Sequence, residues 1–105
     1  MKLIITIIDD QDVDKVMSTL TSQRIGVTRV SSTGGLLGPG SSTLMIGVDE
    51  SQVPQAMQIV GELAAQRQAV VPYGYSASLP LASLVEIPVG GFSSFVLDID
   101  HFEQV

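Results

Sequence analysis

The chain has 105 residues, a size typical of one domain with a modest core. It is 45% hydrophobic with a mean hydropathy of +0.39, so we expect it to bury further apolar surface by self-association. A net charge of −6 with five Lys and Arg residues argues against a nucleic-acid or membrane-surface binder, and the lack of Cys excludes disulfides and thiolate metal sites.

The first apolar run, Leu3–Ile8, is rich in β-branched residues and predicts a central strand. It is too short for a membrane span or a secretory signal, so we expect a cytoplasmic protein. Asp10–Asp12 supply helix caps. Helical spacing follows at Val13, Val16, Met17 and Leu20, and Gly26 is the predicted stop signal.

Two β-type runs, Val27–Ser32 and Ser42–Val48, flank a loop at Thr33–Ser41 that is rich in Gly, Ser and Thr. Gly has no Cβ, and successive N–H groups in a tight turn suit anions such as phosphate. The loop lies between two strands instead of opening a helix, which excludes a dinucleotide-binding fingerprint. A ligand-binding loop and a plain hairpin tip both remain open.

A second helix is predicted over residues 52–66, with caps at Asp49–Ser51 and Pro54 in the first turn. Ala69–Pro72 follows as a short strand. Tyr73–Leu84 carries no charge and no helix cap, and we interpret it as a second loop.

The chain ends in two further runs. Val85–Val89 is interrupted by Pro88 and predicts an edge strand, Gly90-Gly91 predicts a turn, and Phe92–Ile99 predicts another strand. The whole order is an α+β, ferredoxin-like βαββαβ pattern with an extra C-terminal hairpin, in a single domain over residues 1–105.

Catalysis has little support in the sequence, and we predict that the chain is not an enzyme. His101 is the one His and lies in an acidic tail. Asp9 with Asp10, and Asp98 with Asp100, are compatible with a cation or with acid–base chemistry, but capping and solubility explain them equally well. No oxygen ligands occur at metal-loop spacing, so no metal or cofactor is predicted.

Aromatic residues near the predicted loops are candidates to stack on a purine ring. They are Tyr73, Tyr75, Phe92 and Phe102. Packing in the core or at an interface is the competing interpretation, and it is favoured for Phe92 and Phe95 because both fall on a predicted strand.

Three collinear stretches carry a family resemblance: MKLIITIIDDQD, STGGLLGPGSSTLMIGVD and VEIPVGGFSSFVLDIDHFEQV. Together they resemble the PII-like cyclic-di-AMP receptors over essentially the whole chain. The resemblance implies a homotrimer with a ferredoxin-like fold and ligand sites in the three subunit interfaces. It also implies reversible cyclic-di-AMP binding, loop ordering passed to a protein partner, and no catalysed reaction.

The resemblance also implies ligand contacts at individual positions. Thr28 would hydrogen-bond the adenine edge or a nearby phosphate, and Gly47 would allow close approach of the ligand. Gln104 would reach across from the C-terminal segment.

Further contacts are implied in and after the first loop. Gly35, Leu36 and Leu37 would give backbone contacts and a wall for one adenine. Ser41 stands where the family often has an Asn that reads a base.

Three positions depart from the family's usual pattern. Gly26 replaces an Arg that would offer a bidentate phosphate clamp, Leu36 replaces an aromatic residue, and Ser41 has a shorter reach than Asn. Arg24 and Arg29 are the candidate replacements for the missing Arg, provided that their side chains point inward. Two alternatives therefore stay open: a PII-like trimer that binds ATP or AMP, and a ligand-free trimeric interaction scaffold.

Overall fold

The computed structural model describes residues 1–30, 40–72 and 84–105. Its elements, in chain order, are β1 (Lys2–Asp9), α1 (Asp10–Ser22), β2 (Gly26–Val30), β3 (Ser41–Val48), a 3₁₀ turn η1 (Glu50–Gln52), α2 (Val53–Ala64), β4 (Arg67–Pro72), β5 (Leu84–Val89) and β6 (Phe92–Asp98). Within these three ranges no helix combines the length and the apolar character that crossing a membrane requires.

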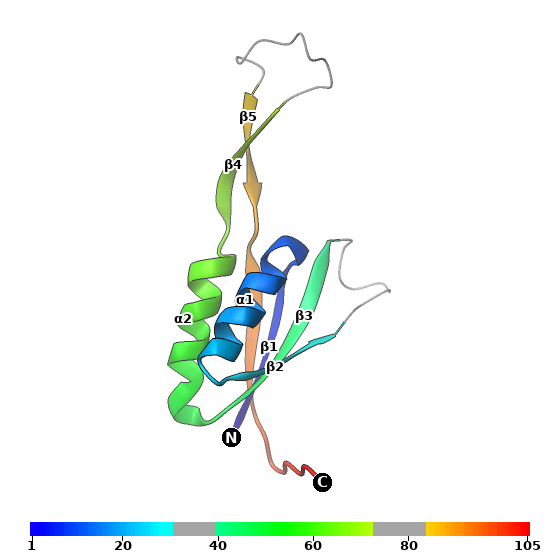
Figure 1. Cartoon of the computed structure of the whole chain (residues 1–105), viewed down its shortest axis with the longest axis vertical. Helices are drawn as coiled ribbons and strands as arrows, with labels where there is room; N and C mark the ends of the chain where they lie inside the picture. Colours follow the sequence, from blue (N-terminus) through cyan, green and yellow to red (C-terminus); the bar gives the residue numbers. More distant parts are fainter. Residues whose placement is uncertain (31–39, 73–83) are drawn as a thin grey trace.

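Four strands form an antiparallel sheet in the order β2-β3-β1-β6, and both helices cover one face of it (Figure 1). β1 is central, as its β-branched run predicts. The α+β, ferredoxin-like prediction is confirmed. The core between the two layers consists of Ile4, Ile8, Val13, Val16, Leu20, Ile25, Leu44, Ile46, Val48, Ala56, Val60 and Ala64.

The extra hairpin lies elsewhere than predicted. β4 pairs with β5 in a separate two-stranded ribbon that extends away from the two-layer body, and β6 pairs with β1 as the fourth strand of the sheet (Figure 1). The predicted C-terminal hairpin of β5 with β6 is therefore wrong. Gly90 and Gly91 have φ values of +76° and +102°, and here these conformations lead the chain out of the ribbon instead of folding β6 back onto β5.

Helix α1 begins and ends through side-chain and backbone caps. The Asp9 carboxylate accepts a hydrogen bond from the Gln11 N–H at 3.0 Å. At the other end the Ile25 N–H donates to the Leu20 carbonyl at 3.0 Å. Arg24, just before Ile25, takes the left-handed conformation with φ 62° that this hydrogen bond needs. Gly26, predicted as the stop signal, instead begins β2, because Arg24 takes the left-handed conformation that usually favours Gly.

An ion pair at the base of the ribbon joins β4 to α1. The Arg67 guanidinium donates to the buried Asp12 carboxylate, with Nη2 2.7 Å from Oδ1 and Nη1 3.3 Å from Oδ2, and these hydrogen bonds raise the pKa of Arg67. Beside it, the Gly91 N–H donates to the Ala64 carbonyl at 2.7 Å. Gly90 has φ +76°, a conformation that other residues rarely adopt, and a Cβ there would lie 3.1 Å from the Ala65 carbonyl oxygen, so Gly is favoured at this position. These contacts fix the ribbon to the body.

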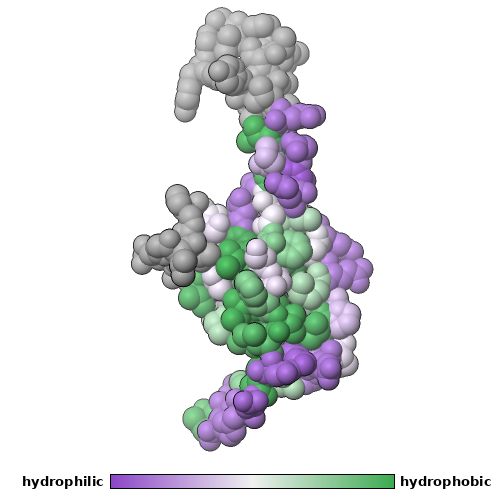
Figure 2. Space-filling model, turned by 180° about the vertical axis from the view of Figure 1, so that it is seen from behind, coloured by the Kyte–Doolittle hydropathy of each residue, from purple (hydrophilic) through white to green (hydrophobic). Residues whose placement is uncertain are grey.

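The sheet face away from the helices, which we call the open sheet face, is apolar. Residues of β1 that point to it, such as Ile5, are half-buried, whereas their neighbours toward the helices are fully buried. Ile5 lies directly between Met45 on β3 and Phe95 on β6. Phe95 is 55% exposed and Leu97 is 46% exposed. Figure 2 shows hydrophobic residues gathered across this side of the body, a pattern typical of an interface.

Candidate functional site

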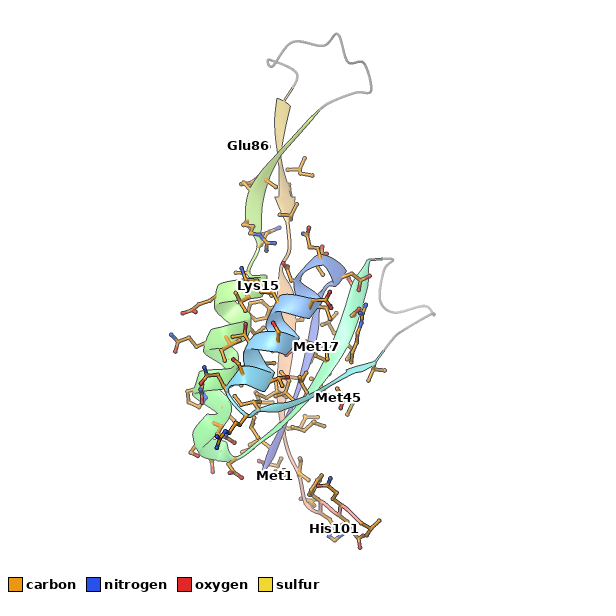
Figure 3. All side chains as sticks on the ribbon, viewed as in Figure 1. Met1, Lys15, Met17, Met45, Glu86 and His101 are labelled. Atoms are coloured by element: carbon orange, nitrogen blue, oxygen red, sulfur yellow. The ribbon has the colours of Figure 1, made fainter. Side chains whose placement is uncertain are left out.

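A cleft of about 660 Å³ lies at the end of the sheet where β1 begins, and we call it the tail cleft. Met1 and the tail that carries His101 lie at this same end (Figure 3). The volume of the tail cleft is within the range of small-molecule sites. The cleft is lined by Met1, Leu3, Gly26, Val27, Thr28, Met45, Gly47, Ile99, Phe102, Glu103 and Gln104.

Three of the predicted ligand contacts meet in the tail cleft. Thr28 comes from β2, Gly47 from β3 and Gln104 from the C-terminal tail. A Cβ at Gly47 would have its nearest neighbour 4.0 Å away, at Met1 Cε, so the fold itself tolerates a side chain there. The space beside Gly47 in the cleft is therefore open to a ligand.

Ser41 lies apart from these three residues. It lines a second cleft of about 240 Å³, the ribbon-base cleft, together with Ile7, Ile8, Asp9, Gly90, Gly91, Phe92 and Ser93. Ser41 and Gly47 are at opposite ends of β3, roughly 20 Å apart at the usual rise of a strand. Gly35, Leu36 and Leu37 lie outside the described residues.

Arg29 does not replace the missing cation of the tail cleft. It pairs with Leu44, a core residue, and so points to the helix-covered face of the sheet, opposite to Thr28. There its Nη2 donates to the Ser42 hydroxyl at 3.0 Å and lies 3.4 Å from the Asp10 carboxylate. The Ser42 hydroxyl in turn donates to Asp10.

No Lys or Arg side chain is among the described residues that line the tail cleft. Arg24, the other candidate to replace the missing Arg, is therefore not a lining residue either. Glu103 contributes an acidic group instead. A phosphate in this cleft would therefore contact backbone N–H groups or a cation brought by another copy of the chain.

The C-terminal tail is anchored beside the cleft by two contacts, one between β1 and β6 and one between the residues that flank them. The Lys2 ammonium donates to the Asp98 carboxylate, and the Ile99 N–H donates to the Met1 carbonyl at 3.3 Å. The hydrogen bond from Lys2 lowers the pKa of Asp98, and the same hydrogen bond raises the pKa of Lys2.

These two pKa shifts predict a stability window for the Lys2–Asp98 pair. Because the pKa of folded Asp98 lies below its ordinary value of 3.8, the pair stabilises the fold above that pH and the stabilisation is lost as the pH falls below it. The pKa of folded Lys2 lies above 10.5, so the contribution is also lost as the pH rises beyond that value. Urea unfolding should show wild type more stable than Asp98→Asn at neutral pH, with the difference shrinking below pH 3.8. A difference that stays constant with pH contradicts this assignment.

The other acidic and basic candidates have structural roles. Asp9 caps α1, as the capping interpretation predicts, whereas Asp10 is the first helical residue and accepts hydrogen bonds from Ser42 and Arg29. His101 Nε2 lies 3.5 Å from the Glu103 carboxylate in a tail where both side chains are more than 70% exposed. Among residues 1–30, 40–72 and 84–105, no group of three or more His, Asp or Glu side chains is placed to hold a metal ion.

Several lining residues were not predicted from the sequence. Met1, Leu3, Met45 and Ile99 form much of the apolar part of the tail cleft. The alternation along β1 and β3 puts Leu3 and Met45 on the face opposite the core, which is the one signal that could have identified them. Of the aromatic candidates, Phe92 packs against the core, as predicted, and Phe102 lines the tail cleft. Tyr73 and Tyr75 lie outside the described residues.

Two comparisons relate the chain to known proteins. Among solved structures, the chain is similar to a functionally unknown protein from Pediococcus pentosaceus ATCC 25745, with a TM-score of 0.82 and 30% sequence identity, covering 99% of this chain and 96% of that one. A sequence model of the cyclic-di-AMP receptor family matches residues 1–105. The chain therefore belongs to the cyclic-di-AMP receptor family.

Proposed function

We propose that this chain is a cytoplasmic signal-transduction protein that binds cyclic-di-AMP at the subunit interfaces of a homotrimer and passes the ordering of its loops to a protein partner. The observation that carries the proposal is the tail cleft, which gathers Thr28, Gly47 and Gln104 from three separate segments. Family membership supports the choice of ligand.

Two features support the interface location. The open sheet face leaves apolar side chains such as Phe95 and Leu97 exposed, and a second copy would cover them. Ser41 lies at the end of β3 opposite to Gly47, so one ligand contacts both when the Ser41 end of one copy meets the Gly47 end of the next. Gly35, Leu36 and Leu37 stay predicted contacts.

Isothermal titration with cyclic-di-AMP tests the proposal, with ATP, AMP and cyclic-di-GMP as comparisons. We expect selective, saturable binding of cyclic-di-AMP. Selective binding of ATP or AMP would favour a PII-like sensor retuned to another adenine nucleotide, which is the second candidate. Binding of none of the four would leave a ligand-free scaffold and contradict the proposal.

Gly26 offers a direct test of the phosphate contact. A Cβ built at Gly26 has no atom within 4 Å, so Gly26→Arg should fold normally. An Arg at the rim of the tail cleft adds a bidentate partner for phosphate, and hydrogen bonds to charged groups contribute about 1.5–3 kcal/mol. We expect tighter cyclic-di-AMP binding with a stronger salt dependence by calorimetry. Gly26→Gln is the uncharged control, and no gain for Arg over Gln would place the phosphates away from this rim.

A further inference from the structure

Phe102 is a large apolar side chain that this chain leaves in solvent. It is 60% exposed, whereas Phe92 packs against the hydrophobic core. Resting on the proposed function, we infer that Phe102 is the stacking surface for one purine base of the ligand in the tail cleft. The sequence names Phe102 only as one of four aromatic candidates, and the family match assigns no role to it.

The position of Phe102 follows from how the tail leaves the sheet. The contacts of Ile99 with Met1 and of Asp98 with Lys2 hold the start of the tail against β1. Three residues later Phe102 lines the tail cleft, in the same segment as Gln104. The aromatic ring and the Gln amide are therefore presented to one cleft from one short stretch of chain.

The chemistry of the cleft suits a purine. A base needs an apolar surface for its faces and hydrogen-bonding groups for its edge. Phe102 is the aromatic residue among the described residues of the lining, and Met45 adds a polarisable thioether. The Thr28 hydroxyl and the Gln104 amide supply groups for the base edge.

Substitutions that separate aromatic from merely apolar character test the inference. Phe102→Leu keeps an apolar side chain and removes the ring, and Phe102→Tyr keeps the ring. By calorimetry with cyclic-di-AMP we expect Phe102→Leu to lose about 5- to 150-fold in affinity, the range of base–aromatic stacking, while Phe102→Tyr binds like wild type. Equal affinity for Phe102→Leu and wild type overturns the inference.

A fluorescence experiment separates this inference from the identity of the ligand. The sequence has no Trp, so Phe102→Trp introduces a single indole whose emission is quenched when a base stacks on it. His101→Trp is the matched control, because His101 is 79% exposed in the same tail and is not among the cleft-lining residues. We expect cyclic-di-AMP to quench the Phe102→Trp variant far more than the His101→Trp variant.

Each other outcome has a distinct meaning. Quenching of the Phe102→Trp variant by AMP or ATP but not by cyclic-di-AMP supports stacking at Phe102 and contradicts the proposed ligand. Equal quenching of both variants, or no response to any of these nucleotides while wild type binds cyclic-di-AMP by calorimetry, overturns the role of Phe102. The Phe102→Trp variant could also show the emission of a buried indole without ligand and no change when ligand is added. This result overturns the role of Phe102 too, because a neighbouring subunit would then cover the side chain.

Discussion

Replacing Gly47 with Val is expected to weaken nucleotide binding strongly while leaving the fold intact. A Cβ at this position has only Met1 Cε as a neighbour, at 4.0 Å, so the added methyl groups project into the tail cleft and not into the core. Val also favours strands, where Gly is unfavourable. Overpacking typically costs about 1–3 kcal/mol, which corresponds to a loss of about 5- to 150-fold in affinity.

Calorimetry with cyclic-di-AMP and urea unfolding together measure this prediction. Gly47→Ala adds a single carbon and should fall between wild type and Gly47→Val in affinity. Stability should stay the same or rise along the series. Undiminished binding by Gly47→Val would show that the ligand does not occupy the tail cleft. Weaker binding accompanied by unfolding would assign Gly47 a structural role instead.

Replacing Phe95 with Asp is expected to convert the proposed homotrimer into monomers. Phe95 lies directly opposite Ile5 on the open sheet face and is 55% exposed, so the single chain does not depend on burying it. In an oligomer that covers this face, an Asp at position 95 would be an unpaired charge in an apolar interface. Burying such a charge costs far more than one apolar contact contributes.

Sedimentation velocity distinguishes trimer from monomer, and the adjacent residue supplies the control. Val96 is 46% exposed on the same strand, but it pairs with Ile4 and points to the helix-covered side. Val96→Asp therefore introduces the same charge next to Phe95, on the side of the sheet away from the open sheet face. We expect Val96→Asp to stay trimeric and Phe95→Asp to dissociate. The same mass for wild type and Phe95→Asp would place the interface on another surface.

Much of the fold could be predicted because its signals are local. The β-branched run of β1, the helical spacing from Val13 to Leu20 and the caps before both helices each describe one element and its immediate neighbours. The ribbon could not be predicted in the same way. Gly90-Gly91 between two β-type runs is a standard hairpin signal, and the choice between pairing β6 with β5 or with β1 is made by contacts distant in sequence, such as those at Ala64.

The candidate site was accessible mainly through the resemblance. Thr28, Gly47 and Gln104 are ordinary residues far apart in the sequence, and nothing in their spacing shows that they line one cleft. The distance between Ser41 and Gly47 follows from their spacing along one strand, but the residues of neighbouring strands that lie beside each depend on strand register, which the sequence alone does not determine. Arg29 shows the same limit, because a shift of one residue along β2 would have turned its side chain toward the open sheet face.

Native mass spectrometry of the wild-type chain with cyclic-di-AMP tests the central claim most directly, because one spectrum reports both the number of chains and the number of bound ligands. A ligand site in each of the three subunit interfaces predicts a complex of three 11.1 kDa chains that takes up as many as three nucleotides. A monomer that binds one nucleotide would contradict the interface location. A trimer that stays free of cyclic-di-AMP at saturating ligand would contradict the receptor function.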